Sequence, residues 1–362
     1  MPSLFDPITL GATLAPNRIL MAPLTRGRAD RRAVPTPIMA EYYAQRASAG
    51  LIISEATGIS RGGLGWPFAP GLWSDEQAEA WRPVTDAVHA AGGRIVAQLW
   101  HMGRQGHSSV YEAQPVSSSA TRTNGQAHTY SGKQDFEVAR PLSTDEIPAL
   151  LDDYANATRN ALAAGFDGVQ IHAANGYLID QFLRDNANFR DDRYGGAPEN
   201  RIRLLREVAE RVASVAGADR TSVRLSPNGD SQGVNDSDPA SVFLPAAKAL
   251  SDLGIAFLEL REPGPDGTFG KTDVPRLSPQ IRDVFTPPLV LNSDYDTVEA
   301  AQAKLDDGTA DAISFGRTFL ANPDLPERLR TGAALNQSDM RTWYSQGPEG
   351  YIDYPALETE AA

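Results

Sequence analysis

The sequence predicts an α/β fold, a (β/α)8 barrel. Short β-branched apolar runs alternate with longer amphipathic runs, and eight such pairs follow one another along the chain. The apolar runs are nearly continuous, which is typical of parallel strands covered on both faces. The length of 362 residues suits one barrel with loop insertions as well as two ordinary domains. A doubly wound sheet would also have nearly continuous apolar strands. The eight repeats therefore favour the barrel.

Each predicted strand is followed by a helical pattern, as the barrel requires. The strand runs are RILMAPL (18–24), LIISEA (51–56), RIVAQLW (94–100), GVQIHA (168–173), SVRLSP (222–227), AFLEL (256–260), PLVLN (288–292) and DAISFG (311–316). Helices are predicted over 36–48, 75–91, 144–164, 199–215, 239–253 and 297–305. In such a barrel the functional site is expected at the carboxyl ends of the strands and in the loops after them.

We expect residues 1–362 to form a single domain. The 26 prolines and 31 glycines are spread along the chain, so no linker is evident. The longest connection, about 102–141, is rich in Gly, Ser, Thr and Gln, and loops of this length are usually functional or mobile. We expect it to cap the barrel mouth.

Composition excludes several classes of function. The chain has 33 basic and 46 acidic residues, a net charge of −13, which disfavours nucleic acid as a partner. It has no cysteine, which excludes disulfides, thiolate metal sites, iron–sulfur clusters and a cysteine nucleophile. Neither a signal peptide nor an apolar run long enough to span a membrane is evident. A cytoplasmic protein is therefore expected.

The residues at the predicted strand ends are mostly hydrogen-bond donors. They are Thr25, Ala56, Gln98 with Trp100, His172, Arg224, Glu259, Asn292 with Ser293, and Gly316 with Arg317. Neither carboxylates with acid/base spacing, nor an HExxH motif, nor a GxSxG motif is present, so we expect no metal site and no hydrolase.

For three of these positions, the residues alone leave both a functional and a structural role open. Arg317 follows the last strand, where barrels commonly bind phosphate, yet an ion pair with Asp311 would fit as well. For Arg224, an ion pair at the edge of the core is the favoured interpretation. His172, in the run HAANGY with Asn175 and Tyr177, could supply one of two converging donors, but a structural histidine is the commoner case.

Motifs along nearly the whole chain resemble those of the Old Yellow Enzymes, most closely the bacterial alkene and N-ethylmaleimide reductases. The motifs are APLTRGR (22–28), SEATGIS (54–60), QLWHMGR (98–104), DGVQIHAANGYLIDQFL (167–183), YGG with ENR (194–201), RLSP (224–227), SFGR (314–317), NPDL (322–325) and GYIDYP (350–355). The resemblance implies an FMN-dependent ene-reductase that uses NADPH or NADH to reduce activated alkenes, as a monomer or homodimer.

The resemblance also implies where the flavin ring would lie. Main-chain groups of Pro23, Leu24 and Ala56 would contact the isoalloxazine, and the Thr25 hydroxyl would donate to a flavin carbonyl. Gln98 would meet the pyrimidine edge because a carboxamide both donates and accepts. Arg224 would stabilise the negative charge of the reduced flavin at that edge, which favours a cofactor role over the ion pair.

The phosphate of FMN would rest on Gly316, Arg317 and the turn at Ser293. Relatives commonly have a small glycine-rich turn there, whereas this chain reads NSDY. Serine keeps the backbone N–H that binding needs, but Asp294 adds a negative charge nearby.

By the same resemblance, His172 and Asn175 hold the carbonyl or nitro oxygen of the substrate. The reduced FMN would give a hydride to the β-carbon, and Tyr177 would protonate the α-carbon from the opposite face, since a tyrosine is protonated at neutral pH. Many relatives have a second histidine where Asn175 stands.

Aromatic residues are expected to wall the substrate pocket. The resemblance places Trp66, Trp100 and Tyr351 there, with Phe269 and Lys271 as lid contacts. Arg26 and Arg28 lie in a basic run that could steer the phosphates of a nicotinamide dinucleotide or could simply be a solvated loop.

Other functions are weighed against this one. A non-redox barrel enzyme on a phosphorylated metabolite, such as an aldolase or isomerase, would use the same phosphate turn but lacks a strand-end lysine. A non-catalytic binding barrel would need no proton donor. Flavin relatives with an iron–sulfur cluster, and those with cysteine in place of Thr25, are excluded because the chain has no cysteine.

Overall fold

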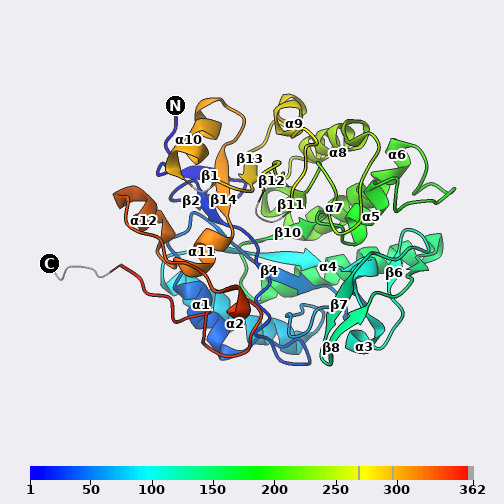
Figure 1. The fold of residues 1–362 in the computed structure, drawn as a ribbon, viewed down its shortest axis with the longest axis horizontal. Helices are drawn as coiled ribbons and strands as arrows, with labels where there is room; N and C mark the ends of the chain where they lie inside the picture. Colours follow the sequence, from blue (N-terminus) through cyan, green and yellow to red (C-terminus); the bar gives the residue numbers. More distant parts are fainter. Residues whose placement is uncertain (268–269, 296, 358–362) are drawn as a thin grey trace.

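Eight parallel strands close into a barrel in the computed structural model, with helices around it (Figure 1). The structure describes residues 1–267, 270–295 and 297–357. The barrel strands are β3 (Ile19–Met21), β4 (Ile52–Gly58), β5 (Ile95–Trp100), β10 (Gly168–His172), β11 (Thr221–Leu225), β12 (Phe257–Arg261), β13 (Leu289–Asn292) and β14 (Ala312–Phe315). Each strand pairs with the next in chain order, and β14 pairs with β3 to close the ring. The predicted (β/α)8 barrel and its eight strands are confirmed.

The larger helices lie around the barrel, with α8 and α9 on one side and α1 and α2 on another (Figure 1). They are α1 (Pro37–Ala44), α2 (Asp75–Ala90), α4 (Ile147–Ala163), α7 (Arg203–Ala216), α8 (Pro239–Leu253), α9 (Ser278–Val284) and α10 (Val298–Asp306). Local signals set their ends: Ser74 and Gln77 form a capping box at the start of α2, and Gly254 ends α8 with a φ of 72°.

One predicted helix needs correction, and one observed helix was not predicted. The helix expected over 199–215 is divided into α6 (Pro198–Arg201) and α7, because Ile202, with φ of −79° and ψ of −9°, lies between them outside both helices. Helix α9 was not predicted, since its seven residues are too short for a clear apolar period.

A hairpin at the N-terminus lies against the amino ends of the barrel strands. Its strands are β1 (Ile8–Leu10) and β2 (Thr13–Ala15). Ile8 and Leu10 pack in one cluster with Leu20, Phe257 and Val290 from the barrel. This packing covers the end of the barrel opposite to the strand carboxyl ends.

The long connection after β5 has structure of its own. It contains a 3-10 turn (Gly103–Gln105), α3 (Ser108–Tyr111), β6 (Val116–Ser117), β7 (Gln126–Thr129), β8 (Gly132–Asp135) and β9 (Arg140–Pro141). Strands β7 and β8 form an antiparallel hairpin near α3 (Figure 1). Its role as a cap stays a prediction, as does the single-domain assignment.

Short helices follow the strands on the carboxyl side: α5 (Leu178–Leu183), α11 (Arg317–Ala321) and α12 (Leu325–Thr331). Further 3-10 turns are Arg61–Gly63, Thr144–Glu146, Ala218–Arg220 and Met340–Thr342. After α12 the chain passes beside α1, where Gln45 Nε2 donates to the carbonyl of Ile352 at 2.9 Å (Figure 1). No helix of the described residues has both the length and the apolar character needed to cross a membrane.

Candidate functional site

A cavity of about 820 Å³ opens at the carboxyl ends of the barrel strands. Most of the predicted site residues line it together: Pro23, Leu24, Thr25, Ala56, Gln98, His172, Asn175, Tyr177, Arg224, Ser293, Gly316 and Arg317. Its volume lies within the range of about 300–1,000 Å³ that small-molecule and cofactor sites occupy. Residues 230–232 after β11 and 335–344 near the C-terminus contribute wall residues that were not predicted.

A chain of side-chain amides crosses the barrel interior below this cavity. Gln98 Nε2 donates to Gln170 Oε1 at 2.8 Å, and Gln170 Nε2 donates to Glu259 Oε2 at 3.0 Å. A carboxylate only accepts hydrogen bonds, so Glu259 sets the direction of both amides. The Gln98 carbonyl oxygen is thereby left for a ligand. Gln170 was missed, although a glutamine in the apolar run of β10 was a visible signal.

Arg224 is both ion-paired and part of the cavity wall. Its Nη1 donates to Glu259 Oε1 at 2.8 Å, and its Nη2 donates to Asn292 Oδ1 at 2.8 Å. The conclusion that a cofactor role replaces the ion pair is therefore wrong. A guanidinium has five N–H donors, so it can serve Glu259 and a ligand together. Its Nε is buried without a partner among the described residues.

His172 presents a neutral imidazole to the cavity. Burial, followed by the charges of Arg224 and Arg261, holds the pKa of His172 well below its usual value. Its Nδ1 is buried and has no hydrogen-bond partner in the described part of the chain. A neutral ring still carries one N–H donor, which can serve an oxygen atom of a ligand.

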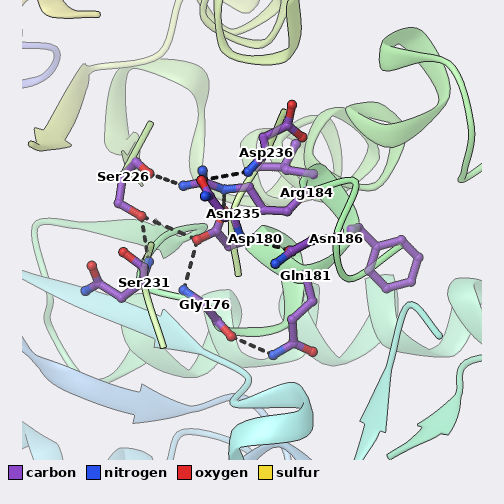
Figure 2. A network of polar contacts seen from close by, with 12 residues as sticks. Gly176, Asp180, Gln181, Arg184, Asn186, Ser226, Ser231, Asn235 and Asp236 are labelled. Atoms are coloured by element: carbon purple, nitrogen blue, oxygen red, sulfur yellow. Dashed lines mark hydrogen bonds and ion pairs between the residues drawn. The ribbon is translucent and has the colours of Figure 1, made fainter. Parts of the chain in front are cut away.

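The turn after His172 is held in a left-handed conformation by buried polar groups. Asn175 and Gly176 have φ angles of 58° and 77°. The Asn175 amide donates to Ser226 Oγ at 2.8 Å, and the Gly176 amide donates to Asp180 Oδ2 at 2.9 Å. Figure 2 shows Gly176, Asp180 and Ser226 directed toward one another. These hydrogen bonds offset the free-energy cost of the left-handed conformation. An asparagine tolerates that conformation better than most residues do.

The anchor of this turn is a fully buried ion pair. Arg184 Nε donates to Asp180 Oδ1 at 2.8 Å, and both side chains have no exposed surface. Arg184 also donates to the Ser226 carbonyl, as Figure 2 shows. Removing one partner of such a pair is strongly destabilising because it leaves an uncompensated buried charge. The sequence run LIDQFLR gave no sign of this role.

Tyr177 is held between two rings. Its ring centroid lies 5.0 Å from that of Trp100 and 4.9 Å from that of His172, both edge-on. Burial raises the pKa of Tyr177 to about 12, against the opposing effect of a side-chain hydrogen bond with Gln232. The phenol is therefore protonated at neutral pH. Trp100, only 1% exposed, lies behind Tyr177 and does not line the cavity, which corrects its expected place in the wall.

The predicted phosphate turn has the backbone shape of a glycine turn. Ser293 and Asp294 have φ angles of 121° and 55°, values that glycine adopts far more readily. Arg317 stands at the first position of α11 on the cavity wall. The alternative ion pair with Asp311 is not formed; Asp311 pairs with Arg282 Nη1 at 2.8 Å instead.

The aromatic residues of the wall differ from those expected. Tyr351 is fully buried and stacks on Tyr42 with centroids 4.1 Å apart, so its expected place in the wall is wrong. Trp66 packs on Tyr344 at 5.1 Å, one layer behind the wall. Trp343 and Tyr344 line the cavity instead, and they follow no barrel strand that could have marked them. The expected Phe269 contact lies outside the described residues.

Arg26 and Arg28 are buried and hold the C-terminal segment. Arg26 Nε donates to the Trp343 carbonyl at 3.1 Å and its Nη2 to the Gly350 carbonyl at 2.6 Å. Arg28 Nη1 donates to the Trp343 carbonyl at 2.8 Å. Neither expectation fits Arg26 and Arg28, because both side chains are buried and neither lines the cavity. Arg31 and Arg32 of the same run are exposed. Arg26 and Arg28 are each satisfied by backbone carbonyls from the far end of the chain.

Comparisons with known proteins identify the family. Residues 3–336 match the model of the NADH:flavin oxidoreductase / NADH oxidase family. A 12-oxophytodienoate reductase 1 from Oryza sativa subsp. japonica is 40% identical over 98% of this chain and 93% of its own length. An old yellow enzyme homologue from Zymomonas mobilis is 67% identical, with a TM-score of 0.97 over 98% of this chain and 100% of its own. Morphinone reductase in complex with tetrahydroNAD is 45% identical, with a TM-score of 0.93 over 99% and 98% of the two chains.

Proposed function

The chain belongs to the NADH:flavin oxidoreductase / NADH oxidase family, as an Old Yellow Enzyme, and from this we propose that it reduces carbon–carbon double bonds conjugated to a carbonyl or nitro group. Membership makes it an oxidoreductase that uses FMN and a nicotinamide reductant. The observation that carries the substrate proposal is the meeting of His172, Asn175 and Tyr177 in one cavity. Two donors and a neutral acid there suit a polarised double bond.

The cavity residues fit FMN. Gln98 and Arg224 both line the cavity. The Gln98 amide uses its Nε2 on Gln170, and the buried Arg224 Nε has no partner among the described residues, so an acceptor and a donor remain for the edge of a flavin ring. Arg317 and the Ser293 turn line the same cavity and offer a guanidinium and backbone N–H groups for a phosphate. Pro23, Leu24, Thr25, Ala56 and Gly316 would complete the binding site. When bound and reduced by NADPH or NADH, FMN supplies the hydride for the β-carbon of the substrate.

His172 and Asn175 act on the substrate oxygen. The neutral His172 ring donates one N–H, and the Asn175 amide donates through Nδ2. Both bonds draw electron density from the conjugated double bond, and they strengthen as negative charge grows on the oxygen. Loss of one such donor costs about 3 kcal/mol, or about 10²- to 10³-fold in rate.

Tyr177 supplies the proton for the α-carbon. Its pKa of about 12 keeps the hydroxyl protonated throughout the neutral range. The edge-on contacts with Trp100 and His172 restrict the phenol ring, so that its proton has a defined direction. The role of Tyr177 is thus to hold and deliver a proton, with no change in its own charge before the reaction.

The non-redox alternative lacks support from the cavity. An aldolase that forms a Schiff base needs a lysine, and the described wall of this cavity contains none. Glu259, the strand-end carboxylate, is occupied by Arg224, Gln170 and Ser314 and is therefore not available as an acid or base.

The visible spectrum of the purified protein tests the proposal. Under anaerobic conditions, NADPH or NADH should bleach the flavin band, and cyclohexenone should restore it. Comparison of the two reductants in the same assay gives the preference between them. A flavin that is bleached but not restored by enones, maleimides or nitroalkenes would refute the substrate proposal and leave family membership intact.

A further inference from the structure

The side-chain amide of Asn175 has two chemically different ends. Nδ2 can donate to a substrate oxygen, whereas Oδ1 would repel an oxygen that gains negative charge. The two ends have nearly the same size, so shape alone does not choose between them. The reaction proposed above therefore needs a group that sets the direction of this amide.

The main chain of Asn175 is already held on both sides. Its N–H donates to Ser226 Oγ at 2.8 Å, and its carbonyl accepts from Gln232 Nε2 at 2.8 Å. With the backbone held, the freedom left to this residue lies in its side-chain torsion angles, and the last of them decides which end of the amide faces the substrate.

Arg261 meets the amide at its oxygen. It is the last residue of β12, it is 7% exposed, and it lines the same cavity. Its Nη1 donates to Asn175 Oδ1 at 3.2 Å. A guanidinium has donors and no acceptor, so a reversed amide would place N–H against N–H. Contact with Arg261 therefore leaves Nδ2 as the end that faces the substrate.

We propose that Arg261 is a positioning residue that orients the Asn175 amide and strengthens its donation to the substrate oxygen. This rests on the function proposed above, in which Asn175 binds that oxygen. The positive charge draws electron density from Oδ1 and makes Nδ2–H a better donor. Because the benefit grows with the negative charge on the substrate oxygen, Arg261 acts mainly on kcat.

The surroundings keep Arg261 charged and in place. Burial, followed by the charge of Arg224, lowers the pKa of Arg261 to about 10, which still leaves it protonated at neutral pH. The negative charge of Asp294 opposes this shift. Gly270 makes room for the guanidinium, since a Cβ there would lie 2.9 Å from Nη2. The departure from a glycine-rich turn at Asp294 thus places a carboxylate where it favours the charge of Arg261.

Steady-state kinetics of the FMN-loaded variants test this role. Arg261→Met should lower kcat for cyclohexenone by about 10- to 100-fold, part of the loss expected for a missing donor, and change KM only slightly. Arg261→Lys keeps a cation without an acceptor and should restore most of the rate. Arg261→Gln, which can both donate and accept, should stay close to Arg261→Met.

The decisive comparison places Arg261→Met in an Asn175→Ala background. If Arg261 acts through the amide, the second substitution should cost almost nothing once Asn175 is gone.

Two outcomes would distinguish a failure of the Arg261 proposal from a failure of the proposed function. The full Arg261→Met loss in the Asn175→Ala background would overturn the positioning role while the proposed function stands. Unchanged cyclohexenone turnover in Asn175→Ala alone would remove the proposed oxygen-binding role, and the Arg261 proposal with it. The dissociation constant of a saturated ketone, cyclohexanone, checks that the pocket is intact: Arg261→Met should weaken it far less than it lowers kcat, and an equal loss would contradict action on kcat.

Discussion

Arg26 is expected to stabilise the protein by holding the segment that carries the aromatic wall of the cavity. Its guanidinium donates to the carbonyls of Trp343 and Gly350 and to the Tyr42 hydroxyl at 3.0 Å. Arg26→Met keeps the apolar stem of the side chain and removes all three bonds. It also leaves the buried carboxyl of Glu55, whose pKa burial raises, with one fewer cation nearby.

The magnitude follows from these contacts. Hydrogen bonds to a charged group contribute about 1.5–3 kcal/mol each, and the desolvation of a buried charge offsets part of their sum. We expect a net loss of about 3–5 kcal/mol in the free energy of unfolding, as for a broken buried pair. The unfolding entropy of 362 residues is about 0.76 kcal/mol/K, so Tm should fall by about 4–7 °C.

Thermal unfolding of the FMN-loaded protein and limited chymotrypsin digestion measure the effect. Cleavage after Trp343 or Tyr344 should become faster in Arg26→Met. Arg32→Met is the matched control, because this neighbouring arginine has a side chain that is 68% exposed and pairs with Asp30 and Glu76 at the surface. Equal melting temperatures and digestion rates for the two variants would refute the argument. A selective loss of nicotinamide use with an unchanged Tm would instead support the steering role that the structure contradicts.

Two further predictions concern the reaction and the phosphate turn. Tyr177→Phe should slow reoxidation of the flavin by cyclohexenone in stopped-flow experiments and leave its reduction by NADPH intact; slower reduction alone would contradict the proton-donor role. Because the pKa of Tyr177 is raised to about 12 and that of His172 is lowered from its usual value, neither group changes charge between neutral pH and about pH 9, so the reoxidation rate should show no titration of either group there. Ser293→Gly should relieve a positive φ that costs on the order of 1 kcal/mol and should raise Tm by about 1 °C; a lower Tm with normal FMN binding would show that serine is not strained at this position.

Much of the fold could be predicted because local patterns determine it. The apolar runs placed all eight barrel strands, and the helix predicted over 239–253 has the bounds of α8. The barrel rule then brought residues at the strand ends, such as Gln98, His172 and Arg224, to one mouth. These predictions rest on features that neighbouring residues encode by themselves.

The contacts between distant segments could not be predicted in this way. Tyr351 and Tyr344 lie seven positions apart, yet one is buried on Tyr42 and the other lines the cavity. Arg26 and Arg28 lie in a basic run that has the composition of a surface loop. Their side chains nevertheless bind backbone carbonyls more than 300 residues away in the sequence. No local pattern distinguishes these cases, because burial depends on which segment packs against each side chain.

The sequence by itself thus determined the order of strands and helices, the absence of thiol chemistry and the set of polar residues at the barrel mouth. Only the tertiary structure decided which donors are already engaged: Arg224 with Glu259, Arg261 with Asn175, and Arg26 with the C-terminal segment. The reason is physical. Apolar periodicity acts over a few neighbouring residues, whereas the hydrogen bonds of a buried guanidinium depend on acceptors that packing brings from elsewhere in the chain.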